Sequence, residues 1–127
     1  MSKRAITSED APKAVGPYSQ AIVANGFVFT SGQVPLDPGT GKLIESADIG
    51  DHVRRVLDNQ RAVLAAAGSS LGRAVKVTIY LANMADFADV NRAYAAYFPD
   101  TPPARSTVQV AALPANARVE MDVIALV

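Results

Sequence analysis

The stretch Val75-Lys76-Val77-Thr78-Ile79-Tyr80-Leu81 alternates its side chains with a period of two residues. A strand with this period points one set of side chains towards a core and the other set towards solvent or a partner. The apolar face of such a strand packs against another layer of secondary structure. The stretch therefore predicts a sheet with one covered face, and the neighbouring segments show what covers it.

Two predicted helices flank this strand. Residues 49–67 and 86–98 carry apolar side chains three and four positions apart, which is the spacing of an amphipathic helix. Gly68 follows the first helix and suits its C-terminal end. Pro99 ends the second helix, because its ring removes a backbone donor and restricts the preceding residue.

Four further segments are predicted to be strands. Runs 18–24 and 27–31 are separated by Asn25-Gly26, a dipeptide that tolerates the positive φ angles of a two-residue hairpin turn. Runs 106–113 and 118–127 also have strand character. This order of strands and helices predicts an α+β fold with helices on one face of a sheet. Another copy of the chain is an economical cover for the opposite face.

Composition excludes several kinds of chemistry. The chain has 127 residues, no cysteine, and a single histidine, His52, which we expect to be exposed at the start of a predicted helix. Its length predicts a single domain over residues 1–127. Without a thiol and with one imidazole, the chain cannot build a cysteine-ligated zinc site, a cysteine nucleophile or a multi-histidine metal centre.

Charge and hydropathy predict the surroundings of the protein. Twelve Lys plus Arg balance twelve Asp plus Glu. Nucleic acid is therefore not expected as a partner, because affinity for a phosphate backbone depends on clustered basic residues. Residues 1–12 contain no apolar run, and no apolar run elsewhere is long enough to span a bilayer. We expect a cytoplasmic protein that does not engage a membrane.

Arg105 is a candidate binding residue. It follows Pro102-Pro103-Ala104 and begins a predicted strand, so its backbone is held stiffly. A guanidinium offers parallel donors that match both oxygens of a carboxylate, which makes Arg105 a candidate anchor for a small organic acid. The alternative is a surface ion pair, which contributes only about 0 to 1 kcal/mol.

Glu120 is a candidate for proton transfer. It lies among Val119, Met121 and Val123, and apolar surroundings raise the pKa of a carboxyl towards the range in which it can move protons. Asp122 has an equal claim by pattern. Simple alternation of polar and apolar residues along a strand explains both carboxylates as well.

Four other polar or small residues are candidate ligand contacts. Ser31 and Gly32 end a predicted strand where backbone N–H groups and a hydroxyl can meet a ligand, although a plain turn explains them equally. Tyr18 either lines a pocket or fills core space. Asn91 stands out because an amide is a mediocre helix former, and a solvated position is the alternative.

Several segments, taken together and in order, resemble the RidA family, formerly called YjgF and also described as endoribonuclease L-PSP. The likeness covers nearly the whole chain. The segments are 14–21 (AVGPYSQA), 29–35 (FTSGQVP), 57–59 (LDN), 87–91 (FADVN) and 103–106 (PARS), followed by Leu113-Pro114 and Val119-Glu120-Met121.

The resemblance implies a chorismate-mutase-like α+β fold, with a mixed sheet of about six strands and two helices packed on one face. It also implies a homotrimer with clefts between subunits. The implied reaction is hydrolysis of 2-imino or 2-enamine acids, such as 2-iminobutanoate and 2-iminopropanoate or 2-aminoacrylate, to 2-oxo acids and ammonia. Pyridoxal-phosphate enzymes release these reactive acids and are protected by their removal. No cofactor and no metal are implied.

The resemblance also implies roles for individual residues. Arg105 resembles the family arginine that holds the substrate carboxylate, and Glu120 resembles the acidic residue that positions or activates water. The positions that line the family's pocket match Tyr18, Ser31, Gly32 and Asn91.

Thr107 departs from the family pattern, because many members of the deaminase subgroup carry cysteine there. A thiol-dependent step is impossible in this chain, while a hydroxyl beside the ligand preserves a pocket contact and shifts substrate preference. Two other functions are therefore considered. One is a non-catalytic regulatory protein that binds small carboxylates. The other is an endoribonuclease or translation inhibitor, which the zero net charge opposes.

The pairing of the last two predicted strands bears on the site. If runs 106–113 and 118–127 form a tight hairpin, Glu120 faces about residue 111, and Arg105 then lies roughly 20 Å away at the rise of a strand. One chain alone cannot assemble the site in that case. Such a separation is consistent with clefts built from two subunits.

Overall fold

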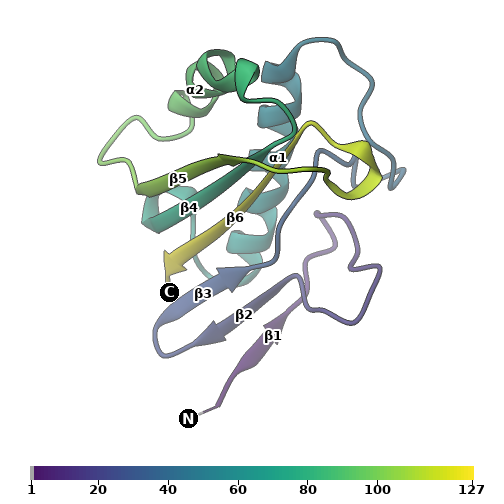
Figure 1. Cartoon of the computed structure of the whole chain (residues 1–127). Helices are drawn as coiled ribbons and strands as arrows, with labels where there is room; N and C mark the ends of the chain where they lie inside the picture. The colour runs from purple at the N-terminus through teal and green to yellow at the C-terminus, as the bar shows by residue number, and fades with distance from the viewer. Residues whose placement is uncertain (1) are drawn as a thin grey trace.

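The computed structural model describes residues 2–127, which form six strands and two α-helices (Figure 1). The strands are β1 (Arg4–Ile6), β2 (Ala21–Ala24), β3 (Phe27–Thr30), β4 (Ala74–Leu81), β5 (Ala104–Gln109) and β6 (Val119–Leu126). The helices are α1 (Ile49–Ala66) and α2 (Phe87–Ala95).

The strands form one mixed sheet in the order β1-β2-β3-β6-β4-β5. Neighbouring strands are antiparallel, except that β4 and β5 are parallel. Helix α1 packs against β6 and β3, and α2 packs beside α1. The predicted α+β fold, with a mixed sheet of six strands and two helices on one face, is confirmed.

Strand β4 has the two faces that its alternation predicts. Val77, Ile79 and Leu81 are fully buried beneath the helices, whereas Thr78 and Tyr80 are partly exposed on the open face. The same core includes apolar residues of α1 on both sides of the buried Gln60, namely Val53, Val56, Leu57, Val63 and Leu64.

Helix α1 matches its prediction closely. Asp48 caps the N-terminus by accepting a hydrogen bond from the Gly50 N–H at 2.9 Å, and Gly68 adopts a φ of 80° just beyond the C-terminus. Only glycine takes that conformation without steric cost. No helix within residues 2–127 is both long and apolar enough to cross a bilayer.

Helix α2 is shorter than the predicted 86–98. It ends at Ala95, and the following residues form a tighter turn in which the Tyr97 N–H donates to the Tyr94 carbonyl at 3.0 Å. The apolar spacing continues to Phe98, which is buried and stacks on Tyr94 with ring centroids 4.5 Å apart. Packing therefore extends the apolar pattern beyond the last helical residue.

The N-terminal hairpin is confirmed, with φ angles of 53° at Asn25 and 82° at Gly26. Its first strand begins at Ala21 rather than at the predicted Tyr18. The preceding Gln20 is buried and uses its amide to hold the Ser8 and Pro12 carbonyls. The prediction missed β1, a short edge strand that pairs with β2.

The last two strands do not form a hairpin. Strand β5 pairs in parallel with β4, and β6 lies on the other side of β4 in antiparallel orientation. The segment β4-α2-β5 is a crossover unit, the connection that parallel neighbours require. The separation between Arg105 and Glu120 that was derived from a hairpin is therefore wrong. Strand β5 runs over Ala104–Gln109 rather than over the predicted 106–113.

Candidate functional site

The sheet register separates the two principal candidates. Arg105 lies opposite Val77 on β4, and Glu120 lies opposite Tyr80. Residues paired across strands share a face, and positions three apart on one strand point to opposite faces. Arg105 therefore lies on the helix side of the sheet and Glu120 on the open side. Two strand spacings and three residues of rise put their Cα atoms about 14 Å apart.

Aromatic rings hold the Arg105 side chain. Its Cζ lies 4.9 Å from the centroid of the Tyr94 ring and 5.7 Å from that of the Phe87 ring, both on α2. Stacking on aromatic faces restricts a guanidinium while leaving its N–H groups at the edge unoccupied. No carboxylate within residues 2–127 forms an ion pair with Arg105, whereas Arg54, Arg61, Arg92 and Arg118 all have one.

Other polar groups surround this guanidinium. Asn91 lies four residues after Phe87 and three before Tyr94, so the three share one face of α2. Thr107 follows Arg105 on the same face of β5. The Thr107 and Tyr94 hydroxyl oxygens are buried, and neither has a hydrogen-bond partner in the described part of the chain. Burial raises the pKa of Tyr94 to about 12, and the nearby Arg105 charge opposes that rise. We use the name arginine half-site for the five residues Phe87, Asn91, Tyr94, Arg105 and Thr107.

A second group of residues forms an open pocket of about 290 Å³ on the other side of the sheet. Its lining consists of Tyr18, Ser31, Gly32, Pro114 and Glu120, which we call the glutamate half-site. The Ser31 hydroxyl donates to the Ser19 carbonyl at 2.6 Å. The segment before β2 and the segment after β3 are thereby tied together around the pocket.

Gly32 leaves space beside the Glu120 side chain and has no positive φ angle. A Cβ added at Gly32 would lie 2.8 Å from Cδ of Glu120 and would also collide with its Oε2. Real Cβ atoms do not approach a carboxyl carbon so closely. A side chain at Gly32 would therefore displace the Glu120 carboxyl, whereas the bare backbone lets this carboxyl approach closely.

The structure distinguishes Glu120 from Asp122, which the sequence left equivalent. The Asp122 carboxylate accepts a hydrogen bond from the Tyr80 hydroxyl at 3.0 Å and lies outside the pocket that Glu120 lines. Glu120 lies in the glutamate half-site. Burial raises the pKa of Glu120, and the neighbouring negative charge of Asp122 raises it further. Glu120 is therefore the carboxyl suited to exchanging protons.

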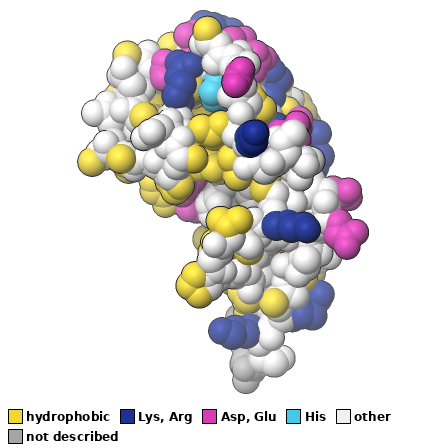
Figure 2. All heavy atoms as spheres, turned by 90° about the vertical axis from the view of Figure 1, so that its right-hand side faces the viewer, with side chains coloured by type: hydrophobic (Ala, Val, Ile, Leu, Met, Phe, Trp, Pro, Cys, Tyr) yellow, Lys and Arg dark blue, Asp and Glu magenta, His cyan; other side chains and the backbone are white. Residues whose placement is uncertain are grey.

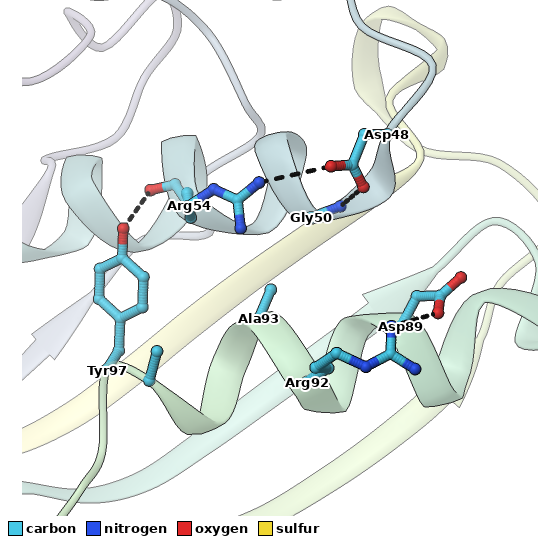
Figure 3. Close-up of a pocket in the computed structure, with 8 residues that line it drawn as sticks. Asp48, Gly50, Arg54, Asp89, Arg92, Ala93 and Tyr97 are labelled. Carbon is cyan, nitrogen blue, oxygen red and sulfur yellow. Dashed lines mark hydrogen bonds and ion pairs between the residues drawn. The ribbon is translucent and has the colours of Figure 1, made fainter.

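The groove between α1 and α2 carries no comparable chemistry (Figure 3). Its cavity measures about 320 Å³, but its two arginines are already paired, Arg54 with Asp48 and Asp51, and Arg92 with Asp89. Every predicted site residue lies outside its lining. On the face shown in Figure 2, basic and acidic side chains are interspersed and form no continuous patch of one sign.

The predicted site residues thus fall into two groups. Tyr18, Ser31, Gly32 and Glu120 come together in one pocket, whereas Arg105, Asn91 and Thr107 gather on the other face. Sequence reasoning missed the roles of Phe87 and Tyr94 beside Arg105, although their spacing around Asn91 was a usable signal. It also missed Pro114. His52 is buried, contrary to expectation, with Nε2 2.8 Å from the Ser46 carbonyl.

Comparisons with known proteins bear on the family and on the fold. The family model described as endoribonuclease L-PSP matches residues 8–127. A RutC family protein of Pyrococcus horikoshii is 50% identical over 123 residues, covering 97% of both chains. The 2-iminobutanoate/2-iminopropanoate deaminase of Salmonella typhimurium is 43% identical over 129 residues, covering 99% of this chain and 98% of its own. A crystal structure of a Rid family protein from Yersinia pestis superposes with a TM-score of 0.95 at 50% identity, covering 99% of this chain and all of the other.

Proposed function

The chain belongs to the RidA family, also known as YjgF or L-PSP, and on that basis we propose that it deaminates small 2-imino acids and their 2-enamine tautomers. The products are 2-oxo acids and ammonia. The arginine half-site of one copy binds the substrate carboxylate, and the glutamate half-site of a second copy supplies the proton-transfer group. The copies form a homotrimer with the reaction site at each interface.

The observation that carries this proposal is the unpaired guanidinium of Arg105. It is stacked on Phe87 and Tyr94, and no carboxylate within residues 2–127 neutralises it. A planar guanidinium binds both oxygens of a carboxylate with charge-assisted hydrogen bonds, each of which contributes about 1.5 to 3 kcal/mol. A small acid is therefore its natural ligand.

The need for a second copy follows from the register of the sheet. Arg105 and Glu120 lie on opposite faces, so one chain cannot direct both groups at one small molecule. The open face also exposes apolar side chains, including Phe29 at 43%, Val108 at 42% and Leu126 at 40%. A closed cyclic assembly covers such a face and places a half-site from each neighbour at every interface.

Hydrolysis begins with attack on the imine carbon, which is already electrophilic and needs no cofactor. Arg105 fixes the carboxylate and so holds the adjacent C2 atom in the cleft. Ionised Glu120 accepts a proton from a water molecule as the water oxygen forms a bond to C2. The electron pair of the C=N bond moves to nitrogen, which takes up a proton from solvent, and the product is a 2-amino-2-hydroxy acid.

Collapse of this intermediate returns the proton. Protonated Glu120 donates to the amino nitrogen, the C–N bond breaks, and the hydroxyl oxygen forms the new carbonyl while releasing its proton to solvent. The sum is imino acid plus water to 2-oxo acid plus ammonia. For an enamine substrate, a proton delivered to C3 and a proton lost from the amino nitrogen first produce the imine. Burial raises the pKa of Glu120, which makes the protonated form more accessible and so suits this carboxyl to act as both acceptor and donor.

A coupled assay tests this proposal. Threonine dehydratase generates the 2-enamine and 2-imino acid from threonine, and the release of 2-oxobutanoate is followed by absorbance. We expect wild-type protein to accelerate this release in proportion to its concentration. Binding of small carboxylates in calorimetry without any acceleration would instead identify the non-catalytic carboxylate-binding function. Salt-sensitive RNA binding and cleavage by nuclease-free protein would identify the endoribonuclease function.

A further inference from the structure

We propose that Gln60, on α1, is a positioning residue that holds Gly32 and Glu120 against each other. The inference rests on the proposed function, because it concerns the carboxyl that exchanges protons there. Gln60 is fully buried and does not line the pocket of the glutamate half-site. It therefore acts on Glu120 only through the segments that it binds.

Two hydrogen bonds connect Gln60 to the glutamate half-site from below. Its Nε2 donates to the Met121 carbonyl at 2.7 Å and to the Ser31 carbonyl at 3.1 Å. Met121 directly follows Glu120, and Ser31 directly precedes Gly32. The Gln60 amide therefore joins Ser31 to Met121. Their sequence neighbours Gly32 and Glu120 are the two residues in tight contact.

A backbone bridge fixes the same two segments on the other side of Gly32. Gln33 and Met121 exchange hydrogen bonds, with the Gln33 N–H donating at 2.9 Å and the Met121 N–H donating at 3.1 Å. Gly32 thus lies between two ties, one made by the backbone of Gln33 and one made by the side chain of Gln60. Loss of Gln60 would remove the tie between the Ser31 carbonyl and the Met121 carbonyl, while the Ser31 N–H and hydroxyl stay bound to the Gln20 and Ser19 carbonyls.

Stability alone does not explain a glutamine at this position. Its Oε1 is buried and has no partner within residues 2–127. An unsatisfied buried acceptor costs about 1 to 3 kcal/mol, which offsets the contribution of about 1 kcal/mol from each of its two hydrogen bonds. An aliphatic side chain would remove the unsatisfied Oε1 but would leave the Ser31 carbonyl without this donor, and the two costs are comparable. The Gln60 amide additionally fixes the distance between the Ser31 and Met121 carbonyls.

Asn59 provides a matched control. It is the neighbouring residue on α1, is also fully buried, and donates through Nδ2 to the Leu36 carbonyl at 2.9 Å. Its Oδ1 likewise has no partner in the described part of the chain. The segment that it holds lies beyond Gly32 and does not adjoin Glu120. Gln60→Met and Asn59→Leu therefore remove equivalent amides from equivalent surroundings, and only the first releases the contact with Glu120.

The first measurement is an NMR titration of the Glu120 carboxyl in the purified full-length variants. In Gln60→Met we expect Gly32 to move away, water to reach the carboxyl, and the pKa of Glu120 to fall towards its ordinary value. The other ionisable groups that face Glu120 are Asp122 on β6, Tyr80 on β4 and Tyr18 in the pocket, and all remain in both variants. In Asn59→Leu we expect the wild-type titration.

The second measurement is the coupled assay. Displacement of a reacting group by a fraction of an ångström should lower kcat in Gln60→Met about tenfold with little change in KM, because Arg105 is untouched. Asn59→Leu should retain the wild-type kcat. A wild-type Glu120 titration in Gln60→Met, or an equal shift in Asn59→Leu, would overturn the inference. The titration does not depend on turnover, so it decides this point even if wild-type protein shows no deaminase activity.

Discussion

Replacement of Arg105 by alanine is expected to raise KM for the imino acid about 100-fold, because two charge-assisted hydrogen bonds worth about 3 kcal/mol together are lost. The coupled threonine dehydratase assay measures this change. Folding should be little affected, since Arg105 makes no ion pair within residues 2–127 and its side chain is only partly buried. Circular dichroism and thermal melting check that expectation.

Two further variants, Arg105→Lys and Arg92→Ala, distinguish carboxylate binding by the Arg105 guanidinium from a general effect of positive charge on the kinetics. Lysine keeps the positive charge but lacks the planar fork that binds two carboxylate oxygens, so we expect it to restore only part of the affinity. Arg92 lies on α2, is 76% exposed and pairs with Asp89. Arg92→Ala should behave as wild type. Unchanged kinetics in Arg105→Ala would remove Arg105 from the site.

Replacement of Glu120 by glutamine is expected to lower kcat about 100-fold or more, which is the usual contribution of a positioned acid–base group. Glutamine preserves the size of the side chain but neither accepts nor returns a proton. The wild-type profile of kcat/KM against pH should lose activity on the acid side as Glu120 becomes protonated, at a pH above the ordinary carboxyl range because burial raises the pKa of Glu120. Glu120→Gln should lack this acid limb.

Asp122→Asn is the control for Glu120. Asp122 lies two residues along the same face of β6 and is hydrogen-bonded to Tyr80. Its negative charge raises the pKa of Glu120, so its removal should lower that pKa and move the acid limb to lower pH. The maximal kcat should stay close to that of wild type. Equal losses in Asp122→Asn and Glu120→Gln would show that the assignment of the two carboxylates is wrong.

The elements of this fold were predictable because each depends on local patterns. The alternation along β4, the helical spacing of α1 and the Asn25-Gly26 turn each express a preference of the backbone within a few residues. Strand β1 was not predictable in this way, because three residues at a sheet edge carry too little apolar pattern.

The pairing of strands was not predictable from local patterns. Runs near 106 and 118 look like partners because they are adjacent in sequence, yet β4 lies between them. Only the parallel crossover through α2 and the position of β6 beside β3 decide this arrangement. The placement of Arg105 and Glu120 on opposite faces follows from that pairing, so no local pattern could have revealed it.

The site was partly predictable. The resemblance to the RidA family selected Glu120 over Asp122, which the residue pattern left equivalent, and the structure supplies the physical distinction through the Tyr80–Asp122 hydrogen bond. The aromatic contacts of Arg105 needed the structure, because Phe87 and Tyr94 also fit an ordinary apolar helix face. Gln60 gave no sequence signal, since a polar residue within a helix is usually solvated.

Mixing the two impaired variants, at a substrate concentration well below the KM of Arg105→Ala, tests whether two chains share the site. The Arg105→Ala variant retains Glu120, and the Glu120→Gln variant retains Arg105. An interface therefore has both native groups wherever a Glu120→Gln subunit supplies the arginine half-site and an Arg105→Ala subunit supplies the glutamate half-site. In a cyclic oligomer assembled from equal amounts of both, about one quarter of the interfaces have this composition. The proposed arrangement predicts that co-refolded mixtures regain about one quarter of wild-type activity. A mixture no more active than either variant alone, with subunit exchange verified by mass spectrometry, would contradict it.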